Sequence, residues 1–167
     1  MSDPVLSRRS IRRYTDEAVS AADVERLLRA AMAAPSAGNQ QPWAFVVVRE
    51  RTVLDAIPGF HPYAAMVPKA SLALVICGLP ESCKWPQMWV QDCSAATQNI
   101  LVEAAALGLG AVWLGVHPLE ERERGVRALL GIPEDVVPFA IVPVGHPAEH
   151  KGPSDRYDLG RVHIERW

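Results

Sequence analysis

A dense basic cluster lies close to the N-terminus of the 167-residue chain. Arg8, Arg9, Arg12 and Arg13 place four guanidinium groups within six residues, and Ser10 adds a hydroxyl group. Guanidinium groups bind phosphate through planar pairs of N–H donors, and a short hydroxyl side chain supplies a further donor. The cluster therefore predicts a site for a dianionic phosphate. The alternative that spacing alone leaves open is a solvated basic surface, or a patch for an acidic partner.

A second candidate segment, PSAGNQQPW at residues 35–43, is rich in neutral donors and acceptors. Ser36 and Asn39 flank the flexible Gly38, and a proline stands at each side of the segment. Hydroxyl and amide groups suit the polar edge of a heterocycle better than they suit a charge. The segment is thus a candidate for binding a ring system, although an ordinary helix-to-strand loop has the same composition.

The third candidate is the glycine-rich segment at residues 108–115, GLGAVWLG. A dinucleotide fingerprint needs a third glycine where this chain has Trp113, and it leads from a strand into a helix. This segment leads into an apolar, strand-like run, so we reject the dinucleotide interpretation.

Two histidines match the spacing of an inverted zinc-protease signature. His146 and His150 enclose Glu149 in the pattern HxxEH. That chemistry requires both histidines on one helical face, and Pro147 within the motif disfavours a helix there. We therefore expect no metal site. The other histidines form no catalytic set that spacing reveals: His61, His117 and His163.

Composition limits the class of protein further. Hydrophobic residues make up 49% of the chain and charged residues 22%, with a net charge of −2. These values are typical of one globular domain spanning residues 1–167, and they suggest neither nucleic acid nor an anionic membrane as a partner. No apolar run reaches membrane-spanning length, and the N-terminus lacks the apolar stretch of a secretory signal. Three cysteines without a CxxC pair indicate reduced thiols and a cytoplasmic location: Cys77, Cys83 and Cys93.

Helical and strand patterns alternate along the chain without regular βαβ repeats, which predicts the α+β class. Ser20 and Asp23 resemble a helix N-cap, and the apolar stripe that follows ends near Pro35. Prolines at 138 and 143 favour an edge or irregular position for the last strand. The expected helices cover residues 24–34, 86–107 and 119–130, and the expected strands cover 45–48, 71–77, 111–116 and 136–144. The polar segment 146–167 is expected to form an extended C-terminal arm.

The expected helix at residues 86–107 is apolar around most of its circumference. Such a helix must be buried on nearly all sides, and a chain of this size has few places to do so. A subunit interface would supply the missing cover, and a central helix within a monomer is the alternative.

Taken together and in this order, the segments resemble the nitroreductase family of flavin enzymes. The resemblance rests on RRSIRRY at residues 8–14, PSAGNQQPW at 35–43, ALGLGAVWLG at 106–115 and the tail at 145–167, so it covers the whole chain. It implies a central, mostly antiparallel sheet flanked by helices in an intertwined homodimer. It also implies two FMN sites at the dimer interface, each lined by both subunits.

The resemblance also assigns roles to individual residues. It places Arg8 and Ser10 on the FMN phosphate, with Arg9 beside them, and Arg12 at the pyrimidine edge of the flavin, where a positive charge stabilises the anionic reduced ring. Arg156 matches a late phosphate ligand, with Lys151 as its rival. The partner subunit would offer Pro35, Ser36 and Asn39, and the backbone at Leu114 and Gly115 would approach flavin N5.

The activity that the resemblance implies is FMN-dependent electron transfer from NADH or NADPH to a nitroaromatic, a quinone or a similar small acceptor. It would follow a ping-pong hydride mechanism at flavin N5, which needs no catalytic side chain. A flavin-binding or interaction protein without turnover is the first alternative, and a zinc hydrolase that uses His146 and His150 is the second. The short segment 78–91 and the glycine at position 115, where larger members often carry an acidic residue, leave the substrate class open.

Overall fold

A single five-stranded sheet forms the centre of the computed structural model, which describes residues 3–152 and 154–167. Its strand order is β1–β2–β5–β3, and the short β4 also pairs with β5. Every one of these pairings is antiparallel, which confirms the expected sheet type. The strands are β1 (Trp43–Val48), β2 (Leu72–Gly78), β3 (Gly110–Ala111), β4 (Leu114–Gly115) and β5 (Val137–Gly145).

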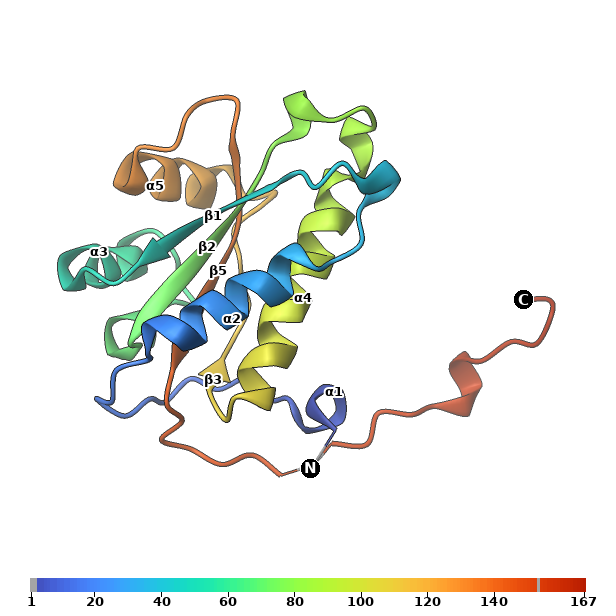
Figure 1. Cartoon of the computed structure of the whole chain (residues 1–167), viewed down its shortest axis with the longest axis horizontal. Helices are drawn as coiled ribbons and strands as arrows, with labels where there is room; N and C mark the ends of the chain where they lie inside the picture. The colour runs from blue at the N-terminus through green and yellow to red at the C-terminus, as the bar shows by residue number, and fades with distance from the viewer. Residues whose placement is uncertain (1–2, 153) are drawn as a thin grey trace.

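Helices cover both faces of the sheet, so the fold has three layers (Figure 1). Leu72, Leu74 and Ile76 of β2 pack in the core with α2 and α4, and the alternating Ala73 and Val75 pack in the core with α3 and α5. This follows from the two-residue period of a strand. The helices are α1 (Pro4–Ser7), α2 (Ala21–Met32), α3 (Arg51–Ala56), α4 (Trp89–Ala106) and α5 (Glu120–Leu130). Short 3-10 turns lie at Ala37–Asn39, Ile57–Gly59, Val67–Lys69, Pro80–Ser82, Pro86–Met88 and Leu159–Arg161.

The last strand does not lie at the edge of the sheet, but it is irregular, which is the other position that its prolines favoured. β5 pairs with β2 on one side and with β3 and β4 on the other. Its prolines fall where the hydrogen-bond ladder is interrupted. Pro138 lies at a register shift opposite Cys77, and Pro143 lies between the residues that pair with β3 and those that pair with β4. A proline without an N–H group is tolerated at such a break.

Two other expectations need adjustment. The predicted strand at 111–116 is divided into β3 and β4, because the chain leaves the sheet at Val112 and Trp113. The long helix starts later than predicted, at Trp89, after a 3-10 turn. Within one chain α4 buries only part of its circumference, and Val90 is 38% exposed.

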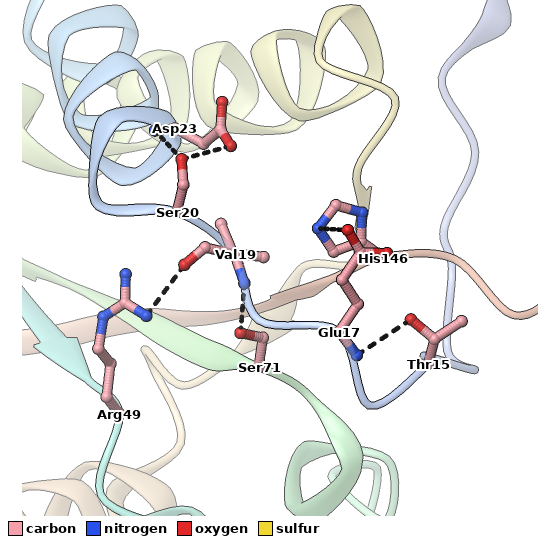
Figure 2. A network of polar contacts seen from close by, with 8 residues as sticks. All are labelled: Thr15, Glu17, Val19, Ser20, Asp23, Arg49, Ser71 and His146. Carbon is pink, nitrogen blue, oxygen red and sulfur yellow. Dashed lines mark hydrogen bonds and ion pairs between the residues drawn. The ribbon is translucent and has the colours of Figure 1, made fainter.

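A polar network holds the segment before α2 against the sheet (Figure 2). The backbone N–H of Val19 donates to Ser71 Oγ at 2.8 Å, and Arg49 donates to the Val19 carbonyl at 3.1 Å. Ser20 caps α2 by accepting from the backbone N–H of Asp23 at 3.0 Å, as predicted. His146 lies 3.6 Å from a carboxylate oxygen of Glu17. These contacts join the N-terminal segment to the end of β5.

Beyond Gly152 the chain runs away from the three layers toward the C-terminus (Figure 1). Several large apolar side chains of this arm are exposed: Tyr157, Leu159, Val162, Ile164 and Trp167. In the described part of the chain no helix combines the length and the apolar character that a membrane crossing requires.

Candidate functional site

The basic N-terminal cluster lies along the outer side of β3. Ser10 forms a parallel bridge with Ala111, and the Ile11 N–H donates to the Ala111 carbonyl at 3.0 Å. Gly110 permits this close approach, because a Cβ atom there would lie 2.6 Å from the Ile11 side chain. The glycine-rich segment thus brings residues 8–12 beside Leu114 and Gly115, two parts of the chain that are a hundred residues apart.

Residues from the end of β5 onward hold the basic cluster in place. Glu149 Oε1 accepts the backbone N–H of Arg12 at 2.6 Å, and Lys151 Nζ donates to the Ser10 carbonyl at 2.6 Å. The hydrogen bond from Arg12 favours the charged carboxylate and lowers the pKa of Glu149 below its ordinary value, with a smaller contribution from Lys151. The backbone of the cluster is therefore fixed, while the guanidinium groups of Arg8 and Arg12 form no hydrogen bond or ion pair with the described residues.

A cavity of about 720 Å³, here called the basic pocket, opens beside the cluster. Within it Arg9 donates through Nε to the Gly152 carbonyl at 2.8 Å, and its Nη2 atom is buried without a hydrogen-bond partner among the described residues. A buried guanidinium N–H without an acceptor is costly, so this donor fits an anion such as phosphate. The pocket is lined by Val5, Leu6, Arg8, Arg9, Ser10, Arg12, Gln98, Lys151, Ser154, Asp155, Arg156 and Tyr157.

A second cavity of about 370 Å³, the central pocket, lies next to it. Arg12 lines both cavities. The central pocket includes Leu114 and Gly115 of β4, and its mixed apolar and polar lining suits a ring system. Its lining residues are Arg12, His61, Pro62, Tyr63, Ala65, Met66, Trp113, Leu114, Gly115 and Arg122.

Two polar side chains of the central pocket meet at one backbone atom. His61 Nε2 lies 3.0 Å from the carbonyl oxygen of Gly115, and Arg122 Nη1 donates to the same oxygen at 2.8 Å. His61 is only 1% exposed. Burial lowers the pKa of its imidazole below the ordinary value of 6.5, so the ring is neutral at neutral pH.

The amide-rich loop lies at the other end of the molecule. Asp92, in the first turn of α4, accepts from the Ala37 N–H at 3.0 Å and from Gln40 Nε2 at 2.8 Å. The basic cluster instead shares a cavity with Leu101 and Ala105 near the end of α4. Leu101 and Ala105 follow Asp92 by 9 and 13 residues along α4, which corresponds to about 14 to 20 Å at roughly 1.5 Å per residue. Among the described residues, those predicted from this loop line neither pocket: Pro35, Ser36 and Asn39.

The structure thus brings together seven of the ten predicted site residues within one chain: Arg8, Arg9, Ser10, Arg12, Leu114, Gly115 and Arg156. Arg156 and its rival Lys151 both line the basic pocket. Sequence reasoning missed His61, Arg122 and Glu149. His61 and Arg122 carry no local signal, because they meet Gly115 across 54 and 7 residues respectively. Glu149 was noticed only within the HxxEH pattern.

The structure gives the HxxEH pattern at residues 146–150 a different role. Residues 146–150 form no helix, so His146 and His150 do not share a helical face. Within the described residues, no group of three or more His, Cys, Asp or Glu side chains is arranged to hold a metal ion. Glu149 instead anchors the Arg12 backbone.

The cysteines carry no sign of reactivity. All three are free thiols. Burial raises the pKa of Cys77 to about 11 and that of Cys93 to about 12, so both thiols are protonated and poorly nucleophilic.

Comparison with known proteins agrees with this geometry. The sequence profile of the nitroreductase family matches residues 5–73 and 85–146. A protein of Methanothermobacter thermautotrophicus, provisionally named an NADH dehydrogenase/NAD(P)H nitroreductase, is 50% identical over 165 residues, covering 99% of this chain and 86% of that protein.

Two solved structures are also similar. One, provisionally named an NADH oxidase of Clostridium acetobutylicum, is 44% identical with a TM-score of 0.96 and covers 99% of this chain and 100% of its own. The other, provisionally named a nitroreductase of Desulfovibrio desulfuricans and solved in complex with FMN, is 35% identical with a TM-score of 0.84. This similarity covers 100% of our chain and 99% of the other chain. By sequence profile, by identity over nearly the whole chain and by fold, this chain belongs to the nitroreductase family.

Proposed function

We propose that the protein is an FMN-dependent oxidoreductase that passes electrons from NADH or NADPH to a small acceptor such as a nitroaromatic or a quinone. The observation that carries the proposal is that Arg12 lines both pockets. One pocket is rich in arginine and holds a buried guanidinium donor that has no acceptor among the described residues, and the other suits a ring. A ring compound that carries a phosphate needs this pair of sites.

The residues of the basic pocket fit the phosphate of FMN. Arg8 and Ser10 supply a guanidinium and a hydroxyl donor, and Arg9 supplies the unsatisfied buried N–H. Lys151 is already engaged by the Ser10 carbonyl, so Arg156 is the better candidate for a further phosphate contact. These five side chains are cationic or neutral, which favours a dianion. The lining also includes one carboxylate, Asp155, whose Oδ1 accepts the backbone N–H of Tyr157 at 3.0 Å.

The central pocket fits the flavin ring. Arg12 supplies positive charge, and the Leu114–Gly115 segment of β4 forms part of the pocket wall. FMN, when bound, supplies the two-electron chemistry, accepting electrons from NADH or NADPH and giving them to the acceptor. The protein's part is to bind the ring, leave one face open and stabilise negative charge on the reduced form, and no nucleophile or general acid is required.

We further infer that the protein acts as a homodimer in which the loop at 35–39 completes the partner's site. The support is the position of this loop at the far end of α4, together with the exposed apolar residues of the arm, which a second copy would cover. A cytoplasmic location is proposed on the basis of the three free cysteines.

The test begins with the purified protein. Denaturation should release FMN rather than FAD, since an adenylate has no room beyond a phosphate enclosed by arginines. Anaerobic addition of NADH or NADPH should bleach the flavin absorbance, and an acceptor should restore it. When the concentrations of the nicotinamide and of the acceptor are both varied, double-reciprocal plots of the initial rate should be parallel if the two substrates bind in the same cleft one after the other. A yellow protein that no nicotinamide bleaches would instead be a flavin-binding protein without this turnover.

A further inference from the structure

The Gly115 carbonyl is held from two sides by side chains that the proposed chemistry does not itself use. His61 comes from the irregular segment between α3 and β2, and Arg122 comes from the first turn of α5. Their nitrogen atoms lie 3.0 Å and 2.8 Å from the same oxygen. This pair of hydrogen bonds, here called the carbonyl clamp, ties two separate elements to β4.

The hydrogen-bond pattern of His61 sets its tautomer. Its Nδ1 accepts the backbone N–H of Tyr63 at 3.3 Å, so this nitrogen carries no proton. The proton of the neutral ring is therefore on Nε2, which donates to Gly115. A buried histidine with both nitrogens satisfied in this way acts as a rigid donor and does not exchange protons with a substrate.

Arg122 adds a charge to the same place. Its guanidinium lies over the ring of Tyr63, 5.5 Å from the centroid, and within the described residues no carboxylate pairs with it. The side chain lines the central pocket together with Arg12. The pocket therefore holds two arginines, and the pairing pattern leaves the positive charge of Arg122 unneutralised.

A clamp is needed at this position because of the local backbone. β4 has only two residues, and Gly115 has no side chain to restrict its backbone or to pack against neighbours. A Cβ atom at Gly115 would meet nothing within 4 Å, so the wall of the pocket is open there. The pairing of β4 with β5 holds the strand itself, and the two hydrogen bonds of the clamp add a second hold on the Gly115 carbonyl.

We propose that His61 and Arg122 are positioning residues that fix the Gly115 backbone against the flavin ring, and that Arg122 supplies the second positive charge of the central pocket. This inference rests on the proposed function for the flavin, but the clamp itself is a property of the protein without cofactor. The two parts are therefore tested separately.

The first measurement uses the flavin-free protein labelled with ¹³C-glycine. Removal of one donor should move the Gly115 carbonyl resonance upfield, since hydrogen bonding deshields this carbon. We expect the change in His61→Leu and in Arg122→Met, and its absence in His61→Gln, whose amide nitrogen replaces Nε2. Arg124→Met is the matched control, because Arg124 is exposed on the same helix. An unchanged resonance in folded Arg122→Met would overturn the clamp, even if the His61 variants fail to fold.

The second measurement is the midpoint potential of bound FMN. Arg122→Met should weaken the preference for reduced over oxidised FMN about tenfold, which corresponds to a potential lower by about 30 mV. The midpoint potential should stay close to the wild-type value in Arg122→Lys and should be unchanged in Arg124→Met. If Arg122→Met binds flavin and shows the wild-type potential, the proposal that the charge of Arg122 acts on the flavin ring is refuted. If the wild-type protein binds no FMN, the proposed function fails, and the carbonyl measurement still decides the clamp.

Discussion

The two segments that supply most of the candidate FMN donors, residues 8–12 and 35–39, are each anchored by a carboxylate that accepts a backbone N–H, but they are anchored at different places in the molecule. The first is fixed through its backbone by Glu149 and Lys151, which leaves its side chains directed to a pocket in the same chain. The second is fixed by Asp92 and Gln40 at the far end of α4. Gly38 adopts a left-handed conformation there, with the Trp85 ring against it.

This difference is the basis of the proposal that one chain contributes only part of each site. Both segments are anchored, as binding segments must be, but only the first is joined by the other candidate residues of its own chain. Among the described residues the loop lines neither pocket, which fits the role proposed for it at the site of a second copy. The predictions that follow test this contrast, starting with the largest effect.

The strongest test is complementation between two defective chains. Arg8→Ala should weaken FMN binding by about 10- to 150-fold, the range expected for loss of about 1.5 to 3 kcal/mol in a hydrogen bond to a charged group. The double variant Ser36→Ala, Asn39→Gly should also bind poorly, and glycine there preserves the positive φ of Asn39. In an isolated mixed dimer, one site would have both segments intact.

Titration of that mixed dimer should reveal FMN bound at wild-type affinity to about half of the sites, since a two-fold dimer has two equivalent composite sites. Each parent variant alone serves as the control. If the mixed dimer recovers no tight site, the loop does not act across the interface, and the comparison between the segments must be abandoned.

Within the first segment, the two ends should behave differently. Arg12→Ala should lower the FMN potential by about 30 to 60 mV, from the loss of about 1.5 to 3 kcal/mol of charge-assisted stabilisation of reduced flavin. Arg8→Ala should leave the potential of bound flavin nearly unchanged, because the phosphate is remote from the ring. Potentiometric titration of both variants distinguishes them. If the two variants have equal potentials, Arg12 does not contact the flavin ring.

The anchor of the second segment can be removed on its own. Asp92→Ala deletes the acceptor of two hydrogen bonds at a buried position, and should lower the free energy of unfolding by about 1 to 3 kcal/mol. Amide exchange should accelerate at residues 37–41 and not at residues 8–12. Asp55→Ala, at an exposed position of α3, is the control and should change neither quantity. Faster exchange in both segments would mean that their anchoring is not independent.

The anchor of the first segment should respond to acid, with the smallest effect. The pKa of Glu149 in the folded protein lies below its ordinary value of 4.5, chiefly because its carboxylate accepts the Arg12 N–H. Its contribution to stability is therefore fully present above about pH 4.5 and is lost as the pH falls through the lowered pKa. The ¹⁵N resonance of Arg12 should titrate with a midpoint below 4.5. This transition should vanish in Glu149→Gln and persist in Glu81→Gln.

Much of the architecture was accessible from local pattern. The N-cap at Ser20 and the continuous apolar run of β2 act over a few residues, so the types and approximate ends of α2 and β2 were predicted correctly. The family resemblance rested on motif order along the chain, and the sequence profile confirms it. The edge position considered for β5 was wrong, because an inner strand tolerates proline at points where its hydrogen bonds to the neighbouring strands are interrupted.

The sequence by itself determined which side-chain types are available for a phosphate and a ring, and in which segments they lie. Only the tertiary structure decided that Glu149 anchors the Arg12 backbone, that His61 and Arg122 meet at Gly115, and that the two candidate segments lie at opposite ends of α4. The physical reason is that hydrogen bonds between distant segments depend on how layers pack, and a single sequence carries no periodicity that reports those distances.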